Sequence, residues 1–484
     1  MKRISFCLFA LVVLFTVLSC KKKNDDQDQQ TNLRIICEEL RPFNYVENGK
    51  LKGTTVEIAG GIISLLGLKD QTIEVTSNWD SAMNLVLTRD NVALFTTSLT
   101  EARKGKLQWV GPVSVSLTGF VGLKTSPFNV NSLDDAKKLP SVGVVTGYAT
   151  CELLEKENFT NLVYFNTINE AVAAVYQGSI SSFFEISQPI KATALADGFD
   201  INQLKNLYIL ATIQGYIAFS PGTSPTIVQS WQDKLDQLKT QGSVQEIYNK
   251  YLPGEKAPGL ITIYTEENPP QNYLDGTGAL AGSAVEIAGA MMNLTGRQEL
   301  ITYCSWNAAY DQVLLAPNSM VFSTVLTTPR EPLFQWVGPI CKRGSCFYVR
   351  SNSSTEINSI EEAKQLTKIA VPTGWAAYNE MISLGFTNLV TFTTPQEVFT
   401  KLMQNEVDVV VLNDISIDYL ANELGYKAGD VRNELLLSNS MSYFAFNKET
   451  KPACMQEWQQ AYTAIMNNGT FAGIWHKWYP NIDW

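Results

Sequence analysis

The sequence predicts an α/β protein made of two tandem modules, each with two α/β lobes joined by two crossover strands. The first observation is internal repetition: VEIAG occurs at 56–60 and 285–289, QWVGP at 108–112 and 335–339, and FTNLV at 159–163 and 386–390. The matches keep their order at an offset of 227 to 229 residues, which suits duplication of a whole domain rather than a solenoid repeat. The second observation is that β-rich runs alternate with helical patterns throughout both copies.

The first half of each copy is expected to hold three strands and two helices in the same order. Apolar residues recur at helical spacing over 55–66, and Gly67 can end that helix. The expected elements are a strand at 33–37, a helix at 55–66, a strand at 73–76, a helix after Trp79 and a buried strand at 92–95. Their counterparts in the second copy include a strand at 300–303, a helix after Trp306 and a strand at 320–322.

The second half of each copy adds further strand–helix units. Strands at 141–145 and 369–372 each run through a Thr-Gly step into a helix, and a buried run follows at 407–412 in the second copy. Each copy is expected to end in one long helix, at 225–252 and 451–479. This alternation predicts parallel sheets wrapped by helices on both faces.

Each copy is large enough for two lobes, because about 225 residues exceed a typical single compact core. The expected lobe connections are paired extended runs: 113–123 with 209–219, and 340–350 with 437–446. Two strands that join two lobes form a hinge, and hinged lobes can close on a ligand. The modules are placed at 33–254 and 259–484, on either side of a short linker rich in proline and glycine.

The N-terminus, residues 1–19, is predicted to be an export signal. A basic start precedes an apolar run at 4–18 that is short for a membrane span. The end of this run resembles a bacterial lipobox, which implies cleavage before Cys20 and attachment of lipid to its sulfur; an uncleaved anchor helix is the alternative. The polar segment 20–32 would then be a tether. Either reading places the modules outside the cytoplasm, in the periplasm or at the cell surface, and attached to a bacterial membrane.

Composition excludes several classes of protein. The formal net charge is −10 and no basic stripe is present, so nucleic acid is not an expected partner. The single histidine, His476, leaves no ordinary Ser-His-Asp unit in each copy, and no His/Cys cluster suggests a metal. A G-x-x-x-x-G-K phosphate loop is also absent from the sequence. We therefore expect a binding protein without a metal or cofactor, and not an enzyme.

The cysteines do not form a framework shared by the two copies. Cys37, Cys151, Cys304 and Cys454 each lack a matching cysteine in the other copy. The remaining candidates, Cys341 and Cys346, flank a four-residue segment. They could close a small disulfide loop in an oxidising compartment, or remain two free thiols, which is the alternative that we favour.

Both copies contain segments that point to one family. The segment at 40–45 followed by Gly53 resembles the opening of the bacterial extracellular solute-binding proteins of family 3, which are type II periplasmic binding proteins and mostly bind amino acids. The second copy matches at 264–273 and most closely at 322–339. The resemblance implies modules that close on a small anionic or zwitterionic solute and deliver it to an ABC-type permease. A sensor partner is an alternative role, and a small-acid dehydratase-like enzyme on this fold is a third.

The resemblance assigns the central binding role to Arg103 and Arg330, because an arginine at this position grips the ligand carboxylate in the family. A guanidinium group offers a planar fork that matches two carboxylate oxygens. A surface arginine at a helix start is the alternative, although a cation is disfavoured there. Acidic pairs at 38–39 and 266–267 fall near the expected mouth of each site, where we expect them to be solvated.

A Thr-Gly-aromatic step is the second shared feature. Gly147 and Gly374 lie between a strand and a helix, where glycine lets the backbone approach a ligand and the helix start offers N–H groups to an anion. The family usually has a small hydroxyl residue after this glycine, whereas Tyr148 and Trp375 stand here. This departure weakens the expectation of an ordinary amino-acid ligand and could shrink or cover the pocket. A plain strand–helix turn is the alternative.

Aromatic and hydroxyl residues complete the shared site. Trp79 and Trp306 match the position where the family places an aromatic wall against the ligand, although tryptophan is also a common core residue. The pairs Thr96-Thr97 and Ser323-Thr324 end a buried strand, where they would face the crevice at the carboxyl edge of the sheet. Alternatively, their hydroxyl groups could pair with local backbone.

One feature distinguishes the copies. The strand at 407–412 leads into Asp414, which fits the acid that takes the ligand ammonium group in the family; a helix cap is the alternative. The first copy has Ser187 at the same offset and Glu185 two residues earlier. We therefore expect the first module to bind a different ligand, to bind more weakly, or not to bind.

Overall fold

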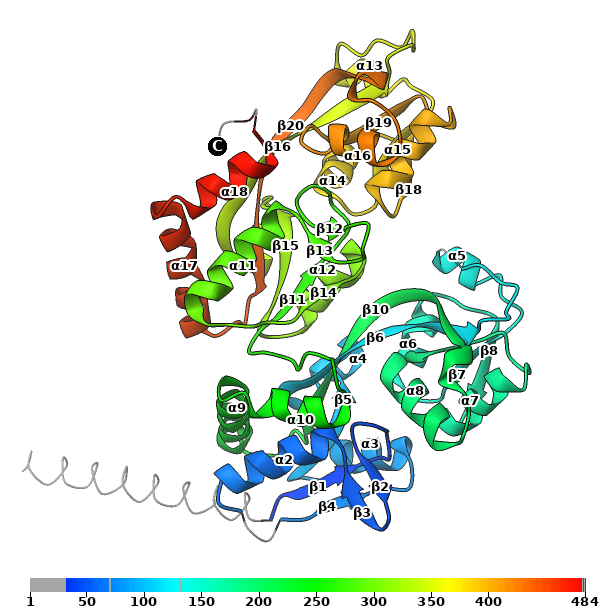
Figure 1. The fold of residues 1–484 in the computed structure, drawn as a ribbon, viewed down its shortest axis with the longest axis vertical. Helices are drawn as coiled ribbons and strands as arrows, with labels where there is room; N and C mark the ends of the chain where they lie inside the picture. Colours follow the sequence, from blue (N-terminus) through cyan, green and yellow to red (C-terminus); the bar gives the residue numbers. More distant parts are fainter. Residues whose placement is uncertain (1–31, 69–70, 131, 481, 483) are drawn as a thin grey trace, which may run out of the picture. The chain divides into compact units, whose positions relative to one another are not determined.

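The computed structural model describes residues 32–68, 71–130, 132–480, 482 and 484 (Figure 1). The predicted signal peptide, and all of the predicted tether except Asn32, lie outside these residues. None of the helices in the described part of the chain is long and apolar enough to cross a membrane. Internal contacts divide the chain into two compact units, Met1–Leu260 and Ile261–Trp484, which contain the two sequence copies.

One eight-stranded sheet runs through the first module in the order β4-β1-β5-β10-β6-β9-β7-β8 (Figure 1). Its strands are β1 (Arg34–Cys37), β4 (Ile73–Val75), β5 (Val92–Ser98), β6 (Gln108–Leu123), β7 (Val142–Val145), β8 (Leu162–Phe165), β9 (Ser182–Ile186) and β10 (Leu204–Phe219). A small hairpin is formed by β2 (Tyr45–Glu47) and β3 (Lys50–Lys52). The helices are α2 (Thr54–Leu65), α3 (Trp79–Thr88), α4 (Glu101–Lys104), α5 (Leu133–Ala136), α6 (Ala149–Lys156), α7 (Ile168–Tyr176), α8 (Ser187–Ala196), η1 (Ile201–Gln203), α9 (Pro225–Thr240) and α10 (Ser243–Tyr251).

The second module repeats this architecture with the sheet order β14-β11-β15-β20-β16-β19-β17-β18. Its strands are β11 (Thr262–Thr265), β12 (Tyr273–Leu274), β13 (Leu280–Ala281), β14 (Ile301–Tyr303), β15 (Ser319–Val325), β16 (Phe334–Arg350), β17 (Ile369–Pro372), β18 (Leu389–Phe392), β19 (Val409–Asn413) and β20 (Val431–Asn447). The helices are α11 (Ser283–Thr295), α12 (Trp306–Leu315), η2 (Glu331–Leu333), α13 (Ile360–Ala363), α14 (Ala376–Ser383), α15 (Pro395–Met403), α16 (Ile417–Glu423), η3 (Ala428–Asp430), α17 (Pro452–Asn467) and α18 (Thr470–Trp478).

The two long central strands of each sheet join the lobes, as predicted. In the first module, β6 and β10 each contain 16 residues and pair with each other along their whole length. At 3.3 Å per residue each strand spans roughly 50 Å, which is enough to serve both lobes. One end of β10 pairs with β5 of the first lobe, and the other end of β6 pairs with β9 of the second lobe.

The sheets are mixed and not parallel throughout, which corrects the sequence prediction. In the first module, β1 is parallel to β4 and β5, and β7 is parallel to β8 and β9. The crossover strands are antiparallel to each other and to their outer neighbours. The reason is topological, because the chain crosses to the second lobe along one strand and returns along the other.

The long helix predicted at the end of each module is broken into two. In the first module α9 ends before Gly242, and in the second α17 ends before Gly469; both glycines have φ 81°. A left-handed residue cannot continue a right-handed helix, and glycine adopts this conformation without a Cβ penalty. The apolar spacing that favoured one continuous helix therefore belongs to two helices that both pack on the first lobe of their module.

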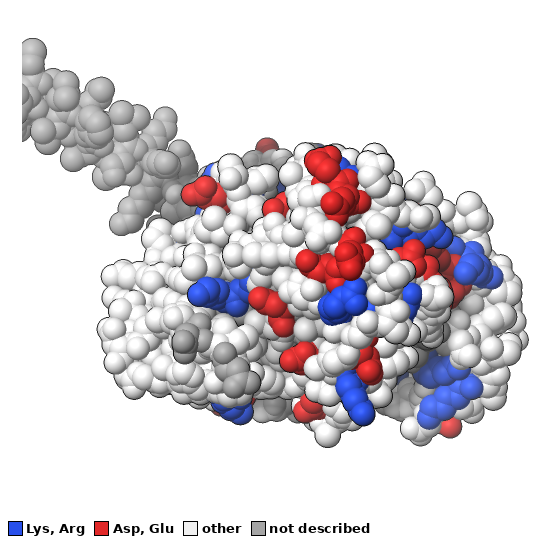
Figure 2. Space-filling model, turned by 90° about the horizontal axis from the view of Figure 1, so that it is seen from above, with Lys and Arg blue, Asp and Glu red and all other residues white. Residues whose placement is uncertain are grey.

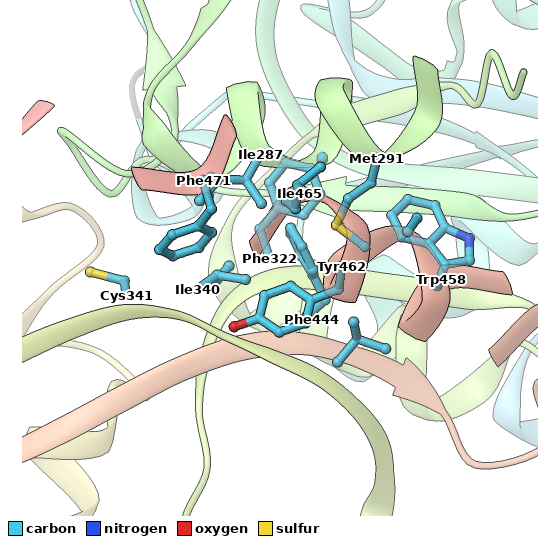
Figure 3. Packing of buried hydrophobic residues seen from close by; sticks show 14 of the residues in the cluster. Ile287, Met291, Phe322, Ile340, Cys341, Phe444, Trp458, Tyr462, Ile465 and Phe471 are labelled. Carbon is cyan, nitrogen blue, oxygen red and sulfur yellow. The ribbon is translucent and has the colours of Figure 1, made fainter. Parts of the chain in front are cut away.

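The core of the first lobe is shown for the second module in Figure 3. Apolar side chains from α11, α17 and α18 meet residues of the central strands; Ile287, Phe322, Phe444 and Trp458 are all buried. Burying a large apolar side chain contributes about 1.5–3 kcal/mol, so this cluster strongly stabilises the lobe. The second lobe has separate apolar clusters, as expected for a module with two cores.

Cys341 and Cys346 are free thiols, and both are buried. They lie five positions apart on the extended strand β16, so their Cα atoms are separated by roughly 16 Å, whereas a disulfide needs less than 7 Å. Cys341 packs in the core of the first lobe and Cys346 in a cluster of the second. The disulfide considered for this pair is therefore contradicted, and the free-thiol alternative agrees with the structure.

Candidate functional site

The first module has a cavity that residues of both lobes line. It measures about 380 Å³ with its open mouth included. The first lobe supplies Glu38, Leu40, Trp79, Thr96, Ser98 and Arg103, and the second supplies Tyr148, Ala149, Thr150, Glu185 and Ile186. Five predicted site residues are thus brought together, namely Trp79, Thr96, Arg103, Tyr148 and Glu185. The other two, Thr97 and Gly147, do not line the cavity.

Arg103 of the first lobe is bonded to the second lobe. Its Nη2 donates to the carbonyl oxygen of Gly147 at 2.8 Å and to Oε1 of Glu152 at 2.5 Å. Its guanidinium carbon lies 5.3 Å from the ring centroid of Trp79. The side chain of Arg103 is buried, so a carboxylate partner offsets part of the cost of removing its charge from water. The arginine that was predicted to grip a ligand carboxylate therefore already contacts a carboxylate of the protein.

Thr96 and Thr97 illustrate how one strand separates two neighbouring hydroxyl groups. Thr96 lines the cavity, has φ 55° and donates to Oδ1 of Asn44 at 2.5 Å. Thr97 is fully buried and donates to the carbonyl oxygen of Leu94 at 3.2 Å. Thr96 therefore faces the cavity, whereas Thr97 pairs with local backbone, so each residue fits one of the two roles considered for the pair. A positive φ at a β-branched residue is strained, and such strain is concentrated at functional sites.

Two carboxyl groups face the cavity of the first module. Tyr148 donates its hydroxyl to Glu38 at 3.0 Å, and Thr150 donates to Glu185 at 2.6 Å. Burial raises the pKa of Glu38 to about 7 and that of Glu185 to about 7. Glu38 is therefore not a solvated loop residue, which corrects the sequence prediction. The hydroxyl of Tyr148 holds it in place.

The glycine of the Thr-Gly-aromatic step makes room for a protein side chain. Gly147 has φ 76°, and a Cβ atom there would lie 2.9 Å from Oδ1 of Asp80 at the start of α3. Trp79 and Tyr148 meet edge to face with ring centroids 6.0 Å apart. The glycine thus permits close contact between the lobes, and the aromatic residue that follows is one of the residues that line the cavity.

The second module has the corresponding cavity, which is smaller. It measures about 200 Å³ with its mouth included. It is lined by Glu266, Trp306, Ser323, Val325, Arg330, Arg343, Trp375 and Ala376. Four predicted residues are present in this set, namely Trp306, Ser323, Arg330 and Trp375. Thr324, Gly374 and Asp414 do not line it.

Arg330 occupies the place of Arg103 but has different partners. Its Nη2 donates to the carbonyl oxygen of Gly374 at 3.0 Å. Its guanidinium carbon lies 5.1 Å and 5.3 Å from the ring centroids of Trp306 and Tyr310. In the described residues its contacts are carbonyl oxygens and aromatic rings instead of a carboxylate. Burial lowers the pKa of Arg330, as expected for a cation with few charged partners.

The neighbours of Arg330 repeat the pattern of the first module. Ser323 has φ 49° and donates to Oδ1 of Asn272 at 2.5 Å, whereas Thr324 donates to the carbonyl oxygen of Phe322 at 3.2 Å. The indole Nε1 of Trp306 donates to the carbonyl oxygen of Gly374 at 3.1 Å. This carbonyl oxygen therefore accepts hydrogen bonds from both Trp306 and Arg330, although Gly374 itself does not line the cavity.

Asp414 does not take the predicted position. Its Oδ1 accepts from the backbone N–H of Gly344 at 2.9 Å and of Ile415 at 2.8 Å. The residue is exposed and does not line the cavity. Its side chain fixes the turn after β19, which is close to the capping role considered as the alternative. The acid that lines this cavity is Glu266, whose exposed fraction is 5%. Glu266 was expected to be solvated, and that expectation is wrong.

Arg343 on β16 is a lining residue that the sequence analysis missed. It is buried, and its Nε and Nη1 have no hydrogen-bond partner in the described part of the chain. Its guanidinium carbon lies 5.9 Å from the ring centroid of Trp375. Burial raises the pKa of Glu266 to about 8, and the positive charge of Arg343 opposes this shift. A comparison of aligned positions could have found Arg343, because the first copy has Ser116 there.

Paired α/β lobes around a cavity that contains a buried arginine define a solute-binding module, present twice. The chain belongs to the bacterial extracellular solute-binding proteins, family 3, whose sequence profile matches residues 33–254 and again 260–481. The "Probable histidine-binding protein" of Neisseria gonorrhoeae is 26% identical over 228 residues, which cover 45% of this chain and 81% of that protein.

Solved structures of similar proteins match one module's length of this chain. A mutant of ArgBP from T. maritima is 17% identical and has a TM-score of 0.42, over 46% of this chain and 95% of that chain. The arginine-, lysine-, histidine-binding protein ArtJ from Geobacillus stearothermophilus is 15% identical with a TM-score of 0.41, over 46% and 96% of the respective chains. A histidine kinase sensor domain with similarity to periplasmic binding proteins is 15% identical with a TM-score of 0.43, over 46% and 96%.

Proposed function

We propose that each module binds an amino-acid-like solute between its lobes, and that the protein serves ABC-type uptake while lipid on Cys20 holds it at a bacterial membrane. The observation that carries the proposal is the buried arginine that lines each cavity, Arg103 and Arg330. The N. gonorrhoeae relative is described as a probable histidine-binding protein, which agrees with a solute of this class.

The second cavity suits a carboxylate on physical grounds. Within the described residues, Arg330 donates to backbone carbonyl oxygens and bonds to the side chain of Tyr310, and these are weaker partners than a carboxylate. Ala376, the first residue of α14, also lines this cavity, and the N-terminus of a helix favours negative charge. A carboxylate between Arg330 and the start of α14 would therefore receive charge-assisted hydrogen bonds from one lobe and backbone N–H groups from the other. Such binding draws the lobes together.

A ligand carboxylate is harder to bind in the first cavity than in the second. Glu152 of the second lobe already accepts from Arg103, so a ligand carboxylate has to displace it. The pair is about a third exposed on the Glu152 side, and solvent screening keeps the cost of displacement modest. The first module is therefore proposed to bind its carboxylate ligand more weakly than the second, unless the ligand makes compensating contacts.

The solute itself can be identified directly. Protein purified from bacteria without added solute is denatured, and the released small molecules are identified by mass spectrometry. An amino acid or a related carboxylate is expected, and the Arg103→Ala/Arg330→Ala double variant should release none. Release of a neutral sugar, equal from both proteins, would contradict the proposal. Mass spectrometry of the detergent-extracted chain tests the anchor: the mass of lipid on Cys20 should be present and should be absent from Cys20→Ser.

A further inference from the structure

The surface and the two cavities differ in how charge is arranged. On the face drawn in Figure 2, acidic and basic side chains are interspersed. In the cavities, acidic and basic groups are instead present in unequal numbers, with more acidic groups in the first and more basic groups in the second. The first is lined by two carboxyl groups, Glu38 and Glu185, and one guanidinium, Arg103. The second is lined by one carboxyl group, Glu266, and two guanidinium groups, Arg330 and Arg343.

In the first cavity the arginine is ion-paired, whereas the two acids are hydrogen-bonded but have no ion-pair partner among the described residues. Arg103 is bonded to Glu152, which lies outside the lining set. Glu38 and Glu185 accept hydrogen bonds from Tyr148 and Thr150, but neither is ion-paired to a cation within the described residues. Buried carboxylates are costly without a cationic partner, and burial accordingly raises the pKa of both groups. A ligand cation is the group that would complete this cavity.

In the second cavity the excess is positive. Arg343 has an exposed fraction of 8%, and two of its nitrogen atoms lack a hydrogen-bond partner in the described part of the chain. A guanidinium group has five N–H donors and needs acceptors when it is buried. Glu266 is the one carboxyl group among the lining residues, and burial raises its pKa to about 8, so it offsets the charge of the two arginines only in part. An additional anionic group is what this cavity lacks.

The difference arises at matched positions of the duplicated sequence. Arg343 stands where the first copy has Ser116, on the same crossover strand. Glu185 stands where the second copy has Leu412, and Glu152 where it has Asn379. Each exchange moves the first cavity toward negative charge or the second toward positive charge. Because the three exchanges act in the same direction, they indicate two specificities and not one site with a degenerate copy.

We propose that the two modules bind solutes of opposite side-group charge. The first takes an amino-acid-like solute with a cationic side group, held by Glu38 and Glu185. The second takes a small dicarboxylate or acidic amino acid, whose second carboxylate is bound by Arg343. The smaller volume of the second cavity agrees with a short acidic solute. This assignment rests on the proposed function, since Arg103 and Arg330 are taken to hold the carboxylate that both ligands share.

Calorimetric titration of the purified full chain tests the proposal with L-arginine and L-lysine as cationic probes and with L-aspartate, L-glutamate and succinate as acidic probes. Arg343→Ser, which introduces the residue type of the first copy, should weaken the acidic probes by about 30-fold or more and leave the cationic probes unchanged. Glu185→Gln should have the converse effect. Arg343→Lys should recover part of the acidic binding, because it restores the charge without the fork.

A loss of folding can be distinguished from a loss of binding, because the unmutated module of each variant serves as an internal control. Cationic binding that persists in Arg343→Ser shows an intact first module, and the recovery in Arg343→Lys excludes a merely structural role in the second. Ser116→Arg supplies a gain-of-charge test, and it should weaken the cationic probes. Binding of the acidic probes that is lost in Arg330→Ala but unchanged in Arg343→Ser would overturn the charge division and leave the proposed function standing. Absence of binding by every probe would overturn both.

Discussion

Arg103 and Glu152 come from opposite lobes of the first module, and their side chains meet at 2.5 Å. The second module has Asn379 where the first has Glu152, so Arg330 lacks this partner. The contact links the lobes through the very group that is proposed to bind the ligand carboxylate. A ligand and Glu152 therefore compete for one guanidinium in the first module, whereas in the second the guanidinium is open to the ligand.

The first prediction follows from this competition. Glu152→Gln should tighten carboxylate binding by the first module about fivefold, since a partly exposed ion pair is worth about 1 kcal/mol. The reciprocal variant Asn379→Glu should weaken binding by the second module by a similar factor. Calorimetry of the full chain with L-arginine and with L-aspartate measures both. Unchanged affinity in both variants would show that Glu152 does not compete.

The second prediction concerns pH and the buried acid of the second module. Burial raises the pKa of Glu266 to about 8, whereas an unfolded chain has a glutamate pKa of about 4.3. The neutral form therefore contributes stability that is fully present below about pH 4.3 and is lost as the pH rises through about 8. The free energy of unfolding of the second module should fall between pH 5 and 9, and Glu266→Gln should flatten this fall.

Scanning calorimetry of the full chain across this pH range checks the prediction, with Glu361→Gln as the control. Glu361 is exposed and pairs with Lys364 on the surface, so its replacement should leave the pH dependence as it is. A wild-type slope that Glu266→Gln does not change would mean that Glu266 is not the responsible group.

The third prediction concerns the glycine beside Trp375. Gly374 has φ 73°, and a Cβ atom there would lie 2.6 Å from Oδ1 of Asn307. Gly385 has φ 88° with open space around it, so Gly385→Ala measures the conformational cost alone. We expect Gly374→Ala to lower the stability of the second module by roughly 1–2 kcal/mol more than Gly385→Ala. Urea unfolding measures the difference, and equal losses would refute the close-contact explanation.

Duplication made the architecture predictable. Each repeated sequence segment lies at an equivalent place in both modules. The crossover strands were expected where β6, β10, β16 and β20 lie. The breaks at Gly242 and Gly469 were missed because apolar spacing continues across them, and only the backbone conformation reveals the left-handed residue. Local patterns identify which face of an element is apolar, but they do not show where one helix ends and the next begins.

The site was predictable where a residue type and its repeated position agreed. Arg103 and Arg330 line the cavities, whereas Asp414 is turned toward backbone N–H groups. Arg343 was missed because a strand residue is assigned to the core or to a cavity by its contacts with other strands, which sequence spacing does not give. Glu266 was missed for the same reason, since a loop acid next to a strand end can be buried by the opposite lobe.

The most direct test of the central claim removes both arginines at once. The Arg103→Ala/Arg330→Ala full chain is titrated calorimetrically with the twenty L-amino acids, beside the wild type and Arg34→Ala, an exposed arginine that pairs with Glu74. Loss of a charged partner in each cavity should weaken binding by about 2–5 kcal/mol, which removes measurable heat, while far-ultraviolet circular dichroism stays the same. A double variant that binds an amino acid with the wild-type Kd would contradict the account.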